Sequence, residues 1–163
     1  MKRCVLVIVV VLTLCATTAT AAPGEILTVG ASAGIAGFFG GGTYLPIDLF
    51  IQWGHVDEWL ILRTDLGIVL GLGSPGPWFD MTVGVGFVVF GSGYGIVDFG
   101  GWLPLVSGLD LIEDSVLVVK PGVGYTWKGF FAELYVPFTI MDEDPGLNLG
   151  WEIRAGYRLS ARL

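Results

Sequence analysis

The carboxyl-terminal stretch "WEIRAGYRLSARL", residues 151–163, alternates between apolar and polar positions. Every second residue from Trp151 is apolar or small, whereas the positions between them include Glu152, Arg154 and Arg158. A period of two is typical of a β-strand, because successive side chains point to opposite faces of a sheet. The stretch therefore predicts a strand with one apolar face and one charged face.

The same alternation recurs along the chain, between short segments of glycine, proline and acidic residues that are typical of turns. A tilted strand crosses a hydrocarbon layer in about 9–11 residues, and about eight strands form the smallest barrel that closes with its interior filled by side chains. We therefore predict an all-β fold, a closed antiparallel up-and-down transmembrane β-barrel. Its strands are expected at 25–38, 43–53, 59–70, 78–90, 94–105, 116–127, 130–141 and 147–162.

Two windows, from Ile26 and from Met81, are apolar enough to be considered as transmembrane helices. Both are rich in glycine, which costs a helix about 1 kcal/mol per residue relative to alanine. A helical inner-membrane protein is therefore the weaker alternative, and far-UV circular dichroism in detergent would distinguish it from a barrel.

Charged residues within the predicted strands share a face with the small residues. In "LILRTDLGIVL", for example, Arg63 and Asp65 lie opposite the leucines. Unpaired buried charges are costly, whereas paired and hydrogen-bonded charges can be accommodated, so we expect the charged face inside and the apolar face against lipid. The predicted interior ionic network consists of Asp48, Arg63, Asp65, Asp80, Asp98, Lys120, Glu133, Glu152, Arg154 and Arg158.

Within this network, Arg154 and Arg158 are expected to pair with acids such as Glu133, Glu152 or Asp48. Lys128 and Arg162, near strand ends, would make acids and bases about equal in number.

The tryptophans gather toward the two ends of the predicted strands, as in interfacial girdles. By parity, however, Trp59, Trp78 and Trp102 point inward. Either bulges reverse the direction of these side chains, or the three tryptophans fill the ends of the barrel.

The amino-terminal segment predicts a signal peptide, residues 1–21, followed by a single barrel domain, residues 22–163. A basic start precedes an apolar run and a stretch of small residues. A lipoprotein signal acylated at Cys15 is the alternative, although the preceding Leu14 is not small. Both cysteines, Cys4 and Cys15, lie in this segment, so the mature chain would contain no thiol.

The net charge of the mature chain limits the partners that it is expected to bind. Loss of Lys2 and Arg3 would leave six basic residues against fifteen acidic ones, a net charge of −9. Such a chain is not expected to bind nucleic acid or anionic membrane surfaces. The acidic stretches "DLIED" and "DEDPG" could bind divalent cations, but neither has the spacing of a known calcium loop, and solvated acidic loops are the favoured interpretation.

Candidate catalytic chemistry is sparse. His55 is the single histidine and lies beside Asp57 and Glu58, with no serine or cysteine nearby. A general base needs a partner within hydrogen-bond reach, so a solvated turn residue is the favoured interpretation. We predict no catalytic residue, no cofactor and no resident metal, and therefore no enzyme.

Taken together, the signal peptide, strand number, apolar outer face and charged interior resemble the small eight-stranded outer-membrane barrels, the OmpA/OmpX-like group. The resemblance implies an outer-membrane location, contact with outer-membrane lipid and recognition by the barrel-assembly machinery. Many members end in phenylalanine, whereas this chain ends in Leu163. The resemblance also implies a periplasmic amino terminus, with the loops near 39–43, 71–77, 106–115 and 142–146 facing outward.

The expected function is that of a non-enzymatic integral outer-membrane protein with a structural or surface-interaction role, or at most a very narrow, porin-like channel. The alternative is a soluble exported barrel that binds a small ligand, as lipocalins do. That alternative requires an apolar interior and a polar exterior.

Overall fold

The computed structural model describes residues 25–39, 41–55, 60–72, 77–105, 115–140 and 147–162. Within these ranges every regular element is a β-strand, and no helix is long and apolar enough to cross a membrane. The strands are β1 (Glu25–Phe38), β2 (Thr43–His55), β3 (Leu60–Leu72), β4 (Pro77–Phe90), β5 (Gly93–Pro104), β6 (Val116–Trp127), β7 (Phe130–Tyr135), β8 (Phe138–Ile140) and β9 (Leu147–Arg162).

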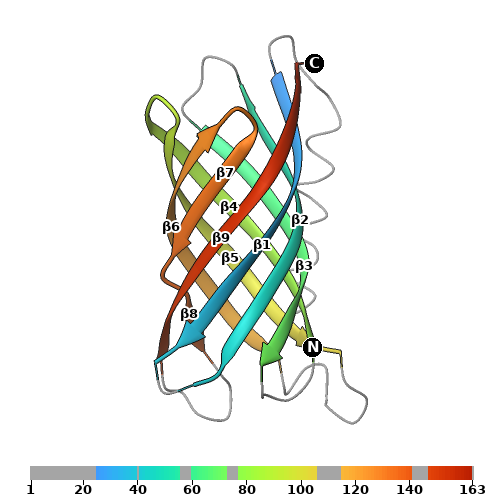
Figure 1. Ribbon diagram of the computed structural model, residues 1–163, viewed down its shortest axis with the longest axis vertical. Coiled ribbons are helices and arrows are strands. Elements are labelled where there is room, and N and C mark those ends of the chain that lie inside the picture. The colour runs from blue at the N-terminus through green and yellow to red at the C-terminus, as the bar shows by residue number, and fades with distance from the viewer. Residues whose placement is uncertain are drawn as a thin grey trace.

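All strands belong to one antiparallel sheet that closes on itself, because β1 pairs with β2 on one side and with β9 on the other (Figure 1). The predicted fold class, a closed antiparallel β-barrel, is confirmed. The strands begin and end within two residues of the predicted bounds. His55, predicted to lie in a turn, is instead the last residue of β2 and pairs with Glu25.

The predicted seventh strand is divided into β7 and β8. Both pair with β6 and β9 in unchanged register, so they occupy one strand position and the barrel is eight-stranded. At the division, Val136 N donates to Pro121 O and Gly150 N donates to Pro137 O, both at 2.9 Å. Neither proline carries an N–H to make the return bond of an antiparallel pair. Two prolines on neighbouring strands therefore interrupt the ladder without displacing the chain.

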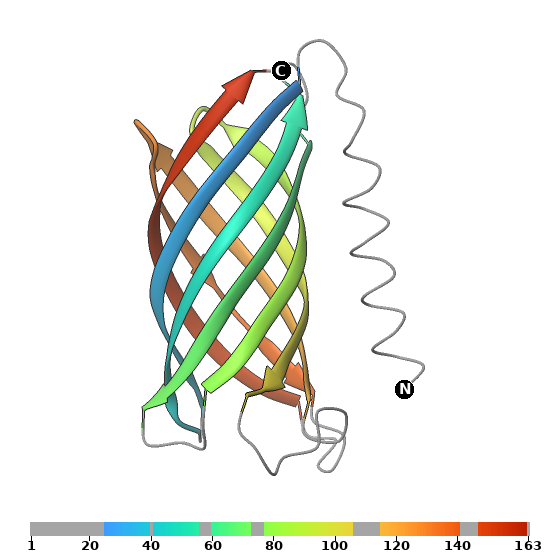
Figure 2. The same cartoon turned by 90° about the vertical axis from the view of Figure 1, so that its right-hand side faces the viewer.

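The cross-strand register sets the tilt of the strands. From Ile26 in β1, the pairings lead once around the barrel and return to β1 at Ala36, a stagger of ten residues. Such a stagger requires strands that are inclined to the barrel axis, as Figures 1 and 2 show. In an eight-stranded barrel of this kind, side chains fill the interior.

Figure 2 shows the two ends of the barrel, and β1 begins and β9 ends at the same one. We call the end that carries Glu25 and Arg162 the terminal end, and the opposite end the loop end. At the terminal end, β6 and β7 are joined by Lys128 and Gly129, with φ of 49° and 87°. Two positive φ values in a two-residue connection define the turn that matches the twist of a β-hairpin.

Side-chain exposure alternates along the strands in the sense opposite to that of a soluble protein. Leu49 in β2 and Val123 in β6 point outward and are 68% and 61% exposed. Asp65 in β3 and Lys120 in β6 point inward and are fully buried. The apolar face is thus the outside of the barrel, and the charged face lines its interior.

Trp78 and Trp102 point inward, as parity requires. Trp102 is buried with Val69, Val116 and Val118, and Trp78 packs against this group. The register shift between β4 and β5 lies at Val88 and Phe90, at the other end of β4, and does not reverse them. These two tryptophans therefore fill the loop end of the barrel, whereas Trp59 lies outside the described residues.

Candidate functional site

The centre of the barrel is organised around Arg154 of β9, which is fully buried. Its Nε contacts Glu152 Oε1, its Nη1 lies 2.9 Å from Asp48 Oδ2 and 3.7 Å from Asp65 Oδ1, and its Nη2 lies 3.6 Å from Asp80 Oδ2. The acids come from β9, β2, β3 and β4. One guanidinium thus connects four carboxylates across the bore.

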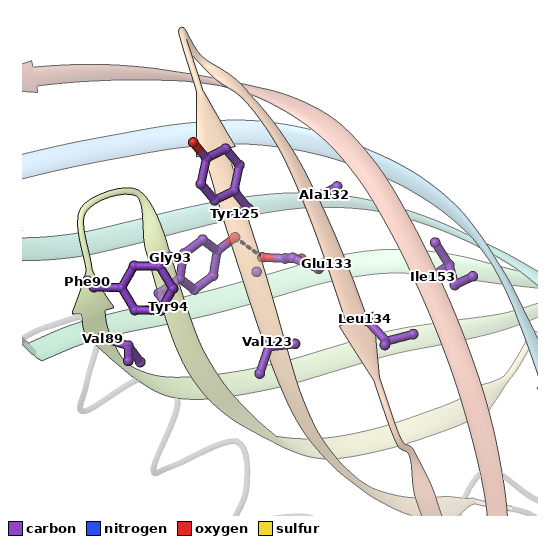
Figure 3. A pocket seen from close by; sticks show the side chains of 11 residues that line it. Val89, Phe90, Gly93, Tyr94, Val123, Tyr125, Ala132, Glu133, Leu134 and Ile153 are labelled. Carbon is purple, nitrogen blue, oxygen red and sulfur yellow. Dashed lines mark hydrogen bonds between the residues drawn. The ribbon is translucent and has the colours of Figure 1, made fainter.

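A second group surrounds Arg63 of β3. Its Nε and Nη2 donate to Asp65, at 2.9 Å and 2.5 Å, and its Nη1 donates to Glu133 of β7. Glu133 also accepts hydrogen bonds from the Tyr94 and Tyr135 hydroxyls, at 2.5 Å and 3.0 Å. Figure 3 shows the Tyr94–Glu133 bond inside the wall formed by β5, β6 and β7.

Lys120 of β6 completes the network, because its Nζ lies 2.9 Å from Asp80 Oδ2, the same oxygen that faces Arg154. Asp98 of β5 is fully buried and pairs in register with Lys120 and Gly84, but neither of its oxygens has a hydrogen-bond partner. The structure therefore places Asp98 in the network without a direct bond among the described residues.

The interior is richer in acids than expected. The six acids of the predicted network are buried, against three fully buried bases, Arg63, Lys120 and Arg154. Lys128 lies in a turn and Arg162 at the exposed end of β9, so neither compensates the interior acids. The expected equality of acids and bases does not hold within the barrel, because both residues lie where strands end and solvent begins.

Arg158 also departs from expectation, since it forms no ion pair with any described residue and is only half-buried. It lies four residues from Arg154 toward the terminal end of β9. Between the two levels, the rings of Phe50 and Phe131 pack edge to face at 5.3 Å. The Phe50 ring lies against Gly30, the register partner of Arg158, and the Phe131 ring lies against Gly156.

Glycines make room for the large inward side chains. A Cβ at Gly67 would collide with the Asp48 carboxylate, and a Cβ at Gly84 would collide with that of Asp98. Each glycine is the cross-strand neighbour of the acid that it accommodates. Glycines on the charged face are therefore needed because the bore is narrow.

Apolar groups close the network on both sides. Toward the terminal end, Ile61, Tyr94, Ile96 and Tyr135 form a buried cluster. Toward the loop end lies the cluster around Trp102, against which Phe38 and Tyr44 also pack. The ionic network thus packs against both clusters, and Tyr94 and Tyr135 of the first cluster also belong to the network as donors to Glu133.

The sequence analysis did not identify Tyr94, Phe50 or Phe131 as members of this interior. All three have inward parity, as Tyr135 does, and Arg63 lies over the Phe50 ring, 4.3 Å from its centroid. The signal in the sequence was this parity, whereas the structure adds that each ring lies against a glycine of a neighbouring strand, as Tyr135 does against Gly122.

Two hollows are present in the described parts of the chain. One, of about 610 Å³, lies on the outer wall over β5, β6 and β7, where Gly93 and Ala132 leave room between bulkier apolar side chains such as Val123 and Leu134 (Figure 3). The other, of about 260 Å³, lies inside the terminal end and contains Arg158.

Several residues considered in the sequence analysis fall outside the described residues: Asp57, Glu58, the stretches "DLIED" and "DEDPG", and the side chain of His55. Within the described ranges, no three histidine, cysteine or acidic side chains are grouped so as to hold a metal ion.

No protein-family model and no curated protein matches the sequence. Among solved structures, the chain is similar to the amino-terminal β-barrel domain of Pseudomonas aeruginosa OprF, with 10% identity, a TM-score of 0.55, and coverage of 84% of this chain and 98% of that one. A de novo designed transmembrane β-barrel gives 14% identity, a TM-score of 0.52, and coverage of 85% and 98%. Neisserial surface protein A gives 15% identity, a TM-score of 0.47, and coverage of 86% and 99%. The fold is that of the small eight-stranded outer-membrane β-barrels.

Proposed function

We propose that this protein is an integral outer-membrane barrel with a closed interior, which holds its loops at the membrane surface in a structural or surface-interaction role and catalyses no reaction. The observation that carries this proposal is the buried ionic network that fills the interior of a barrel whose outer face is apolar. The surrounding partners are then outer-membrane lipid and, during insertion, the barrel-assembly machinery.

The outer wall supports membrane insertion. Large apolar side chains are exposed on the strands all around the barrel, for example Ile51, Phe99, Leu117 and Ile153, each more than 45% exposed. Contiguous apolar surface of this extent marks a membrane or protein contact, and a closed barrel leaves no backbone edge unsatisfied in lipid. A soluble ligand-binding barrel would need the reverse arrangement.

Aromatic side chains on the outer wall support the same orientation relative to the bilayer. Trp127, Phe130 and Tyr157 lie exposed near the terminal end, and Trp151 lies near the loop end. Tryptophan and tyrosine favour the two membrane–water interfaces, so these positions fit the upper and lower limits of a lipid-facing band.

The interior supports a closed barrel in preference to a narrow channel. Arg154 and Arg63 draw acids from several strands into the middle of the bore, and the side chains there are at most 2% exposed. An ion that crossed this layer would have to break pairs whose members are costly to leave unpaired.

Extraction and conductance measurements test this proposal. The refolded protein is expected to require detergent or lipid for solubility and to give no steady single-channel current in planar bilayers. A protein that remains monomeric in buffer without detergent would refute the membrane location. A reproducible current step that scales with the number of inserted molecules would refute the closed interior.

A further inference from the structure

The cavity of about 260 Å³ inside the terminal end, which we call the terminal cup, differs in character from the rest of the interior. Its lining includes Thr28 of β1, Gln52 of β2, and Arg158 and Ser160 of β9, with Tyr94 of β5 among them. The volume is slightly below the roughly 300–1,000 Å³ typical of sites for drug-sized molecules. The terminal cup therefore has space for an ion or a very small molecule.

Among the described residues, the lining of the cup holds a cation and no acid. Arg158 forms no ion pair with any described residue. Arg154, which lies four residues away on β9 and deeper in the barrel, contacts four acids. Glu133 is a described acid whose charge acts on Arg158, and it is already bound by Arg63, Tyr94 and Tyr135. Its acceptor oxygens are therefore already engaged.

Two aromatic rings lie beside Arg158 in the bore. Gly30 is the register partner of Arg158, and a Cβ there would collide with the Phe50 ring. A Cβ at Gly156 would lie 2.6 Å from the Phe131 ring. The two rings thus occupy space beside Arg158, and Arg158 itself lines the open cup.

We propose that the terminal cup binds a small oxyanion, of the size of a carboxylate or phosphate, through the guanidinium of Arg158. Guanidinium groups present a planar fork of donors that matches the oxygens of carboxylates and phosphates. Thr28 Oγ1 and Ser160 Oγ lie 2.8 Å apart and share one hydrogen bond, which leaves one hydroxyl proton free to donate. This inference rests on the interior geometry alone and not on the proposed location or role.

Calorimetric titration tests the inference with inorganic phosphate and with acetate as probes, on the refolded protein in an uncharged detergent at low salt. Saturable one-to-one binding is expected. Arg158→Gln should weaken it by about tenfold or more, which corresponds to about 1.4 kcal/mol and to the loss of a charged hydrogen-bond donor. Arg158→Lys should retain part of the affinity, and Arg162→Gln, at the exposed end of the same strand, should leave it unchanged.

The same titration with a short-chain phosphatidylglycerol tests whether the bound group is a lipid headgroup or a free anion. Because the cup lies within the barrel, the free anions are expected to bind. Absence of saturable binding by both free anions would overturn the proposal, as would equal losses in Arg158→Gln and Arg162→Gln, or binding of the lipid alone. If Arg158→Gln does not refold, Thr28→Val provides a second variant, which is expected to weaken binding severalfold. Unchanged affinity in Thr28→Val would then overturn the proposal.

Discussion

At the scale of single residues, the interior charges are not equivalent. Arg154 is fully buried among four acids, whereas Arg158 is half-buried and unpaired among the described residues. Removing one member of a buried ionic group leaves the others without compensation, and this typically costs about 3–5 kcal/mol. Arg154, and not Arg158, is therefore the arginine on which folding stability should depend.

Arg154→Ala is expected to lower the free energy of unfolding by about 3–5 kcal/mol, and Arg162→Ala, at the exposed end of β9, by much less. The measurement is urea unfolding in detergent micelles, followed by the gel shift between the folded barrel and the heat-denatured chain. Equal effects of the two substitutions would show that the buried ionic layer does not stabilise the barrel.

A second prediction at this scale concerns the lipid-facing side chains. Leu49 lies in the middle of β2 and is 68% exposed, whereas Leu159 lies near the terminal end of β9 and is 61% exposed. Arginine on the lipid face costs about 2–4 kcal/mol at the midplane and about 0–1 kcal/mol near an interface. Leu49→Arg should therefore lower the free energy of unfolding in lipid vesicles far more than Leu159→Arg does. Similar losses of stability in the two variants would show that the outer wall does not face a bilayer.

At the scale of elements, neighbouring strands fit one another through glycines. Gly84 of β4 makes room for the carboxylate of Asp98 of β5, whereas at Gly54 of β2 an added Cβ would find its nearest atom, Leu60 O, at an ordinary 3.4 Å. The many glycines of the chain thus act where one strand must accept a large side chain from the next.

Gly84→Ala is accordingly expected to destabilise the barrel by about 1–3 kcal/mol, the usual cost of overpacking, while Gly54→Ala should be nearly neutral. Urea unfolding of both variants under the same conditions gives the comparison. If Gly84→Ala unfolds with the wild-type midpoint, the inward carboxylate of Asp98 does not occupy the space beside Gly84.

At the scale of the whole molecule, the barrel has two distinct ends, and they allow a test of orientation. Gly41 is exposed at the loop end and Ser92 is exposed at the terminal end. If the amino terminus of the barrel is periplasmic, Gly41→Cys should react with a membrane-impermeant thiol reagent on intact cells, whereas Ser92→Cys should react only after the cells are opened. The opposite labelling pattern would invert the topology.

The strands and the two faces of each strand could be predicted from the sequence. The reason is local, because a side-chain period of two follows from the backbone geometry of any strand, as in the segment around Arg63 and Asp65. Turn residues then separate the strands, and a chain with apolar outward faces has to close so that its backbone is satisfied in lipid.

Which charges meet depends on the tertiary structure. Asp48 and Arg154 come together because the ten-residue stagger and the register of β1, β2 and β9 bring them to the same level of the bore. The same register places the Phe50 and Phe131 rings against Gly30 and Gly156, beside Arg158. Alternation along one strand fixes only whether a side chain points inward, whereas its height in the bore and its partners depend on the register of all the strands together.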